Sequence, residues 1–173
     1  MKRTLVLLSC IVVLAVGAGA QQQINFADMP LIATPAPIPA GYGGLNWSNI
    51  WYVDPNQYVE AGPGYRNFLT HRDVAFVGGQ FCGPVRPACY GVITSAGKPF
   101  IPAGAIVAGG YQAHRITVLA YNNGTYLGMV TYDLATTHQM IKFPAWGAVT
   151  ELQFQTDQAG DLVLIDLIVY PTT

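Results

Sequence analysis

The side chains of this chain that could bind a ligand are mostly rings and amides rather than charged groups. Residues 41–53 hold four rings (Tyr42, Trp47, Trp51 and Tyr52), three glycines and two asparagines. Rings with polar atoms stack on flat, neutral molecules such as sugars, and amides fix the orientation of such a ligand by hydrogen bonding. The segment is therefore either one wall of a sugar site or a core strand with a glycine-rich entry loop.

Alternation along a strand distinguishes these two interpretations, because successive side chains point to opposite faces. One face of the predicted strand 45–53 is mostly apolar, which places Trp47 and Trp51 in the core. The other rings near this segment, with one asparagine beyond it, are the predicted sugar contacts: Tyr42, Tyr52, Tyr65 and Asn67. The alternative for each of them is that it fills the core.

Two carboxylates near the ends of the chain are candidates for holding a metal ion. Asp28 and Asp166 lie in the first and last predicted strands, which are often neighbours in a jelly roll. Calcium prefers oxygen ligands and takes six to eight of them, so loop carbonyl groups would have to complete the site. The alternative is that both carboxylates accept hydrogen bonds from backbone N–H groups of adjacent loops. We therefore keep a structural calcium at Asp28 and Asp166 as one of two hypotheses.

Residue patterns for catalysis are scarce. Beyond residue 20 the only serines are Ser48 and Ser95, and neither lies in a Gly-x-Ser-x-Gly frame. A polysaccharide lyase with His71 or His114 as its base, or a hydrolase, is the lesser alternative. The sequence favours a non-catalytic protein, and we assign no catalytic residue.

The first twenty residues have the pattern of a secretory signal peptide. Lys2 and Arg3 precede an apolar run, residues 5–16, and small residues then lead to a predicted cleavage site before Gln21. The remaining 153 residues, 21–173, are enough for one domain with a core of its own. Without Lys2 and Arg3 that domain has six basic and nine acidic residues, about −3 in charge, which argues against nucleic acid or an anionic membrane as partner.

Secretion also determines how the cysteines are interpreted. Cys10 falls within the signal peptide, which leaves an even pair, Cys82 and Cys89, in an oxidising compartment. We predict that the two form a disulfide. It should stabilise the fold by about 2–3 kcal/mol, less than a disulfide that closes a longer loop. A zinc site is a poor alternative, since no second Cys/His pair stands at zinc spacing.

The chain reads as a series of short β-strands separated by turns. Asn122-Asn123-Gly124 between two β-branched runs is the strongest hairpin signal, and no stretch shows capped helical spacing over three turns. The predicted strands are 24–29, 45–53, 73–77, 90–94, 100–110, 114–121, 125–132, 140–143, 148–155 and 162–170. Ten short strands indicate an all-β fold, a two-sheet antiparallel β-sandwich.

Several motifs also carry a resemblance to a known group: residues 24–28, 38–49, 64–67, 73–76, 116–125 and 164–167. With these motifs the chain resembles secreted jelly-roll β-sandwich proteins of galactose-binding-like or carbohydrate-binding-module type, found among bacterial exported and fungal secreted proteins. The resemblance implies a jelly-roll fold over nearly all of residues 21–173. The Cys82–Cys89 loop is an addition to the usual pattern, and no sorting or membrane tail follows Tyr170, so we expect a released protein.

These observations lead to one functional hypothesis and its competitor. We expect a secreted, non-catalytic carbohydrate-binding protein whose partner is a glycan or polysaccharide at a cell surface or in an extracellular matrix. The competing class is a secreted structural or interaction protein, such as a colonisation or envelope factor, without a glycan site. Three or more rings in one exposed patch would favour the first class, and burial of all but one would favour the second.

Overall fold

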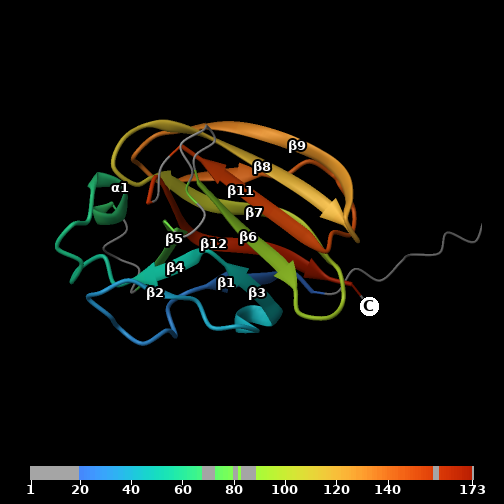
Figure 1. The fold of residues 1–173 in the computed structure, drawn as a ribbon, viewed down its shortest axis with the longest axis horizontal. Coiled ribbons are helices and arrows are strands. Elements are labelled where there is room, and N and C mark those ends of the chain that lie inside the picture. Colours follow the sequence, from blue (N-terminus) through green and yellow to red (C-terminus); the bar gives the residue numbers. More distant parts are fainter. Residues whose placement is uncertain (1–19, 68–72, 80–81, 83–88, 158–159, 173) are drawn as a thin grey trace, which may run out of the picture.

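The computed structural model shows an all-β protein built from two antiparallel sheets. It describes residues 20–67, 73–79, 82, 89–157 and 160–172. The predicted signal peptide and His71 therefore lie outside the described residues, apart from Ala20. Within the described residues there are twelve strands, one 3₁₀ turn and one four-residue helix, and no helix is long and apolar enough to cross a membrane. The sheets pack face to face as a β-sandwich, which confirms the predicted fold class (Figure 1).

The first sheet has seven strands, and the last strand of the chain lies inside it. In spatial order it contains β10 (Gln139–Lys142), β7 (Phe100–Gly109), β12 (Leu162–Pro171), β5 (Val74–Val77), β4 (Ile50–Val53) and β2 (Ala36–Pro37). Strand β1 (Gln22–Asn25) pairs with the second half of β12, so the first and last strands are neighbours, as predicted.

The second sheet has five strands, and the predicted hairpin forms one edge of it. Its order is β3 (Leu45–Ser48), β6 (Cys89–Ser95), β11 (Glu151–Thr156), β8 (His114–Asn122) and β9 (Thr125–Leu134). Asn123 and Gly124 connect β8 to β9 with φ values of 48° and 79°. Positive φ at both central residues is what a two-residue hairpin turn of this type requires, and Asn-Gly supplies it at low cost.

The main core lies between the two sheets, and strand β11 shows how the sequence specifies it. Leu152 and Phe154 are fully buried in this core, whereas Glu151, Gln153 and Gln155 on either side of them are only half-buried. A period of two is the signature of a strand with one face in the core and one toward solvent. Glu151, Gln153 and Gln155 therefore point outward, whereas Thr156 at the end of β11 is buried.

A second, smaller core covers the opposite face of the seven-stranded sheet. The loop after β4 and the helix α1 (Pro63–Arg66) fold over this face, at one end of the sandwich in Figure 1. The buried members of this core are Val53, Ala61, Tyr65, Val74, Phe76, Ala108, Val163 and Ile165. Burial on both faces explains why β12 reads as a nearly continuous apolar run instead of an alternating one.

The prediction of a single strand over residues 45–53 is wrong, because Asn49 divides it between the two sheets. Asn49 has φ of 53°, and its Nδ2 donates to the carbonyl oxygens of Gly78 at 2.8 Å and Tyr90 at 2.7 Å. The break shifts the alternation by one residue. Trp47 is buried as predicted, but Tyr52 is also buried and Trp51 is half-buried on the other face.

We expect Asn49→Ala to lower the free energy of unfolding by about 2–4 kcal/mol, because two buried carbonyl groups lose their donor and alanine strains the left-handed backbone. Asn49→Gly keeps the backbone freedom and so isolates the loss of the two hydrogen bonds. Urea denaturation of both variants measures the effect. A wild-type midpoint for Asn49→Ala would contradict this role.

Close backbone contact between α1 and the end of β7 limits one position to glycine. The N–H of Gly64 donates to the carbonyl of Gly110 at 2.8 Å, and a Cβ on Gly64 would lie 1.9 Å from the carbonyl oxygen of Gly109. Backbone atoms cannot move aside as a flexible side chain can, so α1 would have to lift from the sheet.

We therefore expect Gly64→Ala to destabilise the fold by about 1–3 kcal/mol, the usual cost of overpacking. Gly97→Ala is the matched control, because a Cβ there meets no atom within 4 Å. Chemical denaturation compares the two variants, and equal effects at both positions would count against this account of α1.

Candidate functional site

The outer face of the five-stranded sheet carries a band of amides, hydroxyls and rings. These side chains alternate along four strands with the core residues described above, and strand register places them in rows. We call this surface the polar face and define it by Tyr90, Thr94, Arg115, Thr117, Tyr121, Tyr126, Thr131, Asp133, Glu151, Gln153 and Gln155.

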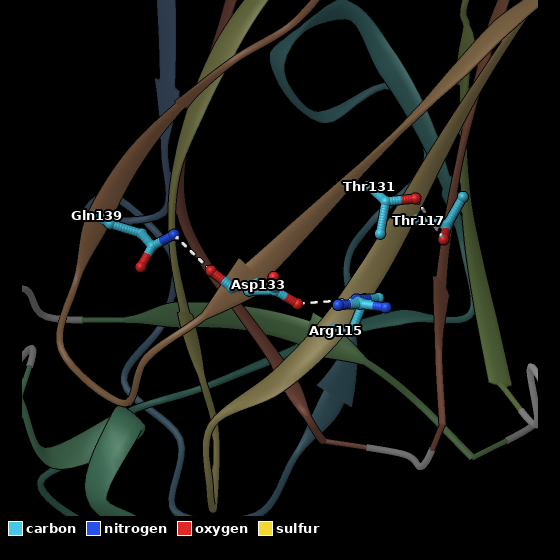
Figure 2. A network of polar contacts seen from close by, with 5 residues as sticks. All are labelled: Arg115, Thr117, Thr131, Asp133 and Gln139. Atoms are coloured by element: carbon cyan, nitrogen blue, oxygen red, sulfur yellow. Dashed lines mark hydrogen bonds and ion pairs between the residues drawn. The ribbon is translucent and has the colours of Figure 1, made fainter.

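One row of the polar face runs across four strands from a tyrosine to a pair of threonines. Tyr90 on β6 lies opposite Gln155 on β11, which lies opposite Thr117 on β8, and Thr117 lies opposite Thr131 on β9. The two threonine hydroxyls are 3.3 Å apart, and Figure 2 shows them facing each other across the strands. Within β11, Nε2 of Gln155 donates to Oε1 of Gln153 at 3.1 Å. The row thus presents oriented donors and acceptors on a rigid sheet.

A second row, at the other end of β11, pairs two rings with a carboxylate. Glu151 of β11 lies opposite Tyr121 of β8. In the pairing of β8 with β9, Leu127 has no opposite residue, so Tyr121 lies opposite Tyr126. The ring centroids of Tyr121 and Tyr126 are 5.6 Å apart with an interplanar angle of 58°. The side chain of Tyr126 is 52% exposed.

Three rings therefore share one solvent-facing surface. Tyr90 is 36% exposed at the Gln155 end of β11, and the Tyr121–Tyr126 pair lies at the Glu151 end. Four residues of strand separate the two ends, which is about 13 Å. Between the two ends, Gln153 lies opposite Val92 and Leu119, and Leu119 lies opposite Met129, so an extended ligand could meet a ring at each end and an amide among apolar side chains in the middle.

The charged residues Arg115 and Asp133 form an ion pair at the far end of this face. Nε of Arg115 donates to Oδ1 of Asp133 at 2.8 Å, and Nε2 of Gln139 donates to the Asp133 carbonyl at 3.1 Å (Figure 2). The hydrogen bond and the charge of Arg115 lower the pKa of Asp133, and the same contacts raise the pKa of Arg115. Both side chains are more than two-thirds exposed, so solvent screens the pair.

The four predicted sugar contacts do not form one exposed surface. The expected exposure of Tyr52 and Tyr65 is wrong: Tyr52 packs in the main core, and Tyr65 is fully buried in the second core on the other side of the sheet. The Tyr65 hydroxyl donates to the Gly160 carbonyl at 3.1 Å, and burial raises its pKa well above the ordinary value. Nδ2 of Asn67 donates to the Thr136 carbonyl at 2.7 Å.

Tyr42, the fourth predicted contact, is half-buried and closely held. Its ring stacks on Phe26 with centroids 5.8 Å apart, and its hydroxyl bonds the Asn25 carbonyl and the Asp28 carboxylate. Burial, followed by the contact with Asp28, raises the pKa of Tyr42. The ring thus fastens the loop after β1 to the 3₁₀ turn η1 (Tyr42–Gly44).

The two residues predicted to hold calcium lie in different surroundings. Asp28 is exposed and accepts a hydrogen bond from Tyr42, whereas Asp166 is 2% exposed within β12. Among the described residues, no group of three or more His, Cys, Asp or Glu side chains could hold a metal. Calcium at Asp28 and Asp166 stays a prediction, which melting curves with and without EDTA can test.

The predicted disulfide between Cys82 and Cys89 is present. Cys89 is the first residue of β6, next to Tyr90 on the polar face. The bond therefore anchors the end of the strand that presents this ring.

Sequence reasoning missed the residues of the polar face, although one signal for them was present. The segment Glu151-Leu152-Gln153-Phe154-Gln155 alternates polar and apolar residues, which already predicts an outward row of one carboxylate and two amides. Tyr90, Tyr121 and Tyr126 could not be added to that row, because their neighbours depend on the pairing of strands far apart in the sequence.

No family model matches the chain, and no curated protein matches it. Solved structures of similar fold include a family 29 carbohydrate-binding module, 11% identical over 80% of this chain and 91% of that chain, with a TM-score of 0.41. A CBM4 structure is 15% identical, covering 87% and 94%, with a TM-score of 0.41. A fucose-binding module of Streptococcus pneumoniae is 12% identical, covering 87% and 96%, with a TM-score of 0.37. The low sequence identities and TM-scores describe only a loose similarity in the path of the backbone.

The Arg115–Asp133 pair generates a prediction about titration rather than stability. Arg115→Gln removes the contact that lowers the pKa of Asp133, so that pKa should rise toward its ordinary value. A carboxyl group whose pKa is lower in the folded state than in the unfolded state stabilises the fold above the unfolded-state pKa, and this stabilisation is lost as the pH falls through the folded-state pKa. Because this ion pair is exposed, it contributes little stability, so the melting temperature of Arg115→Gln should hardly change. Carboxyl-carbon NMR measures the pKa. Arg115→Lys keeps the charge and should keep the pKa low, whereas an unchanged pKa in Arg115→Gln would contradict the assignment.

Proposed function

We propose that this protein is a secreted, non-catalytic carbohydrate-binding β-sandwich that binds glycan chains at a cell surface or in an extracellular matrix through its polar face. The observation that carries the proposal is the presence of three rings, Tyr90, Tyr121 and Tyr126, on one exposed sheet face with a row of amides between them.

The chemistry of this face matches a sugar chain. The C–H side of a pyranose ring is apolar and packs on an aromatic ring, while its hydroxyls need donors and acceptors in fixed directions. Gln153 and Gln155 offer both kinds of group, and their mutual hydrogen bond fixes which atoms face outward. Because the side chains stand on strands of a packed sheet, little conformational freedom is lost on binding.

The proposed location rests on the leader and the disulfide. Residues 1–20 have the charge and apolar pattern of a signal peptide, and a disulfide joins Cys82 to Cys89. Disulfides persist in oxidising compartments outside the cytosol, which are also where extracellular polysaccharides are found.

One observation favours the competing role as an interaction protein without a glycan site. Met129 on β9 shares its sheet face with Thr131 and Asp133, so it belongs to the same surface as the polar face, and it is 62% exposed. Met140 on β10 is 51% exposed, and exposed methionines are common on surfaces that bind other proteins. Binding measurements with purified glycans distinguish the two roles.

Titration calorimetry with the polysaccharides selected on a glycan array tests the proposal. We expect Tyr126→Ala and Tyr90→Ala each to weaken binding by about two- to tenfold, because each removes a stacking surface worth about 0.5–1.5 kcal/mol. Tyr111→Ala is the matched control, since Tyr111 is 42% exposed but contacts Tyr65 in the second core. Absence of binding to any polysaccharide, or full affinity in both polar-face variants, would overturn the proposal.

A further inference from the structure

Glu151 differs from the other carboxylates of the protein in having no partner. The chain has nine acidic residues, and all of them lie among the described residues. Eight have a polar or charged partner: Asp28, Asp54, Glu60, Asp73, Asp133, Asp157, Asp161 and Asp166. In the part of the chain that the structure describes, Glu151 alone among the carboxylates has no such partner, although its side chain is half-buried.

The neighbours of Glu151 on the sheet are a hydroxyl and two rings. Register places Glu151 opposite Thr94 on one side and opposite Tyr121 on the other. Directly opposed residues of antiparallel strands have Cβ atoms about 4.5–5.5 Å apart, so the carboxylate lies within reach of the Tyr121 ring. Tyr126 extends this aromatic surface toward the sheet edge.

A carboxylate beside two electron-rich rings is suited to a cationic group. The carboxylate provides a charge-assisted hydrogen bond to an ammonium group, and the ring faces attract the same positive charge. The guanidinium of Arg115 does not compete, because it is bonded to Asp133 at the other end of the face. An acidic sugar would be repelled here, since Glu151 would face it without a counter-charge.

We propose that Glu151, Tyr121 and Tyr126 form a subsite for the protonated amino group of an amino sugar, so that the preferred glycan contains unacetylated amino sugars. This inference rests on the proposed function and names its ligand class. The charge and the ring pair both contribute: the rings pack on the sugar, and the carboxylate selects the ammonium over an acetamide or a hydroxyl.

Titration calorimetry with two matched oligosaccharides tests the subsite. The probes are a glucosamine hexamer, at a pH where its amines are protonated, and the N-acetylglucosamine hexamer of the same linkage. We expect the wild-type protein to bind the free amine at least about tenfold more tightly, as one charge-assisted hydrogen bond allows. Glu151→Gln should abolish this preference, because only the free-amine hexamer loses an ionic contact. Glu60→Gln makes the same change at an exposed site outside the polar face and should leave the preference intact.

The outcomes separate the inference from the proposed function. Equal binding of both hexamers by the wild-type protein, or an unchanged preference in Glu151→Gln, would overturn the subsite while glycan binding stands. Binding of neither hexamer would overturn the subsite, and absence of binding to any polysaccharide would overturn the proposed function as well. If Glu151→Gln does not fold, a salt titration of the wild-type protein serves instead: the preference should shrink as salt rises, and a salt-independent preference would contradict an ionic contact.

Discussion

Burial of alternate side chains in one central strand is the constraint on which the rest of this structure depends. Leu152 and Phe154 of β11 are enclosed by the main core, and β11 pairs with β6 on one side and β8 on the other. A slip of one residue would turn both apolar side chains to solvent and the glutamines into the core. The packing that stabilises the sandwich therefore also fixes the orientation of every group on the polar face.

The two sheets have different surroundings, and this difference decides where a ligand can bind. The seven-stranded sheet has the main core on one face and the second core, closed by α1, on the other. The five-stranded sheet packs on the main core with its inner face only, and its outer face carries the half-buried and exposed residues. Tyr65 shows the cost of covering a sheet face: its ring is fully buried in the second core and has no surface left for a ligand.

Local patterns predicted the fold, and long-range pairing determined the site. Alternation, turn residues and the Asn-Gly hairpin identified most strands, and the even pair of cysteines beyond the predicted signal peptide identified the disulfide. Alternation gave the wrong result beyond Asn49, because the positive φ of this residue shifts the alternation and places Tyr52 in the core instead of on the predicted surface. The rows of the polar face join β11 to β8 and β6 across thirty or more residues of sequence, and no local pattern records which residues of these strands become opposite one another.

The place of β12 in the seven-stranded sheet has a consequence for how the chain acquires its structure. This strand, the last in the described sequence, pairs with β7 along one side and with β5 and β1 along the other. Until it is available, β1 has no partner strand and β5 and β7 each lack one of their two neighbours, and the loops that must close are long. The seven-stranded sheet therefore cannot be completed until residues 162–171 have been made, and the two halves of this sheet stay unjoined until then.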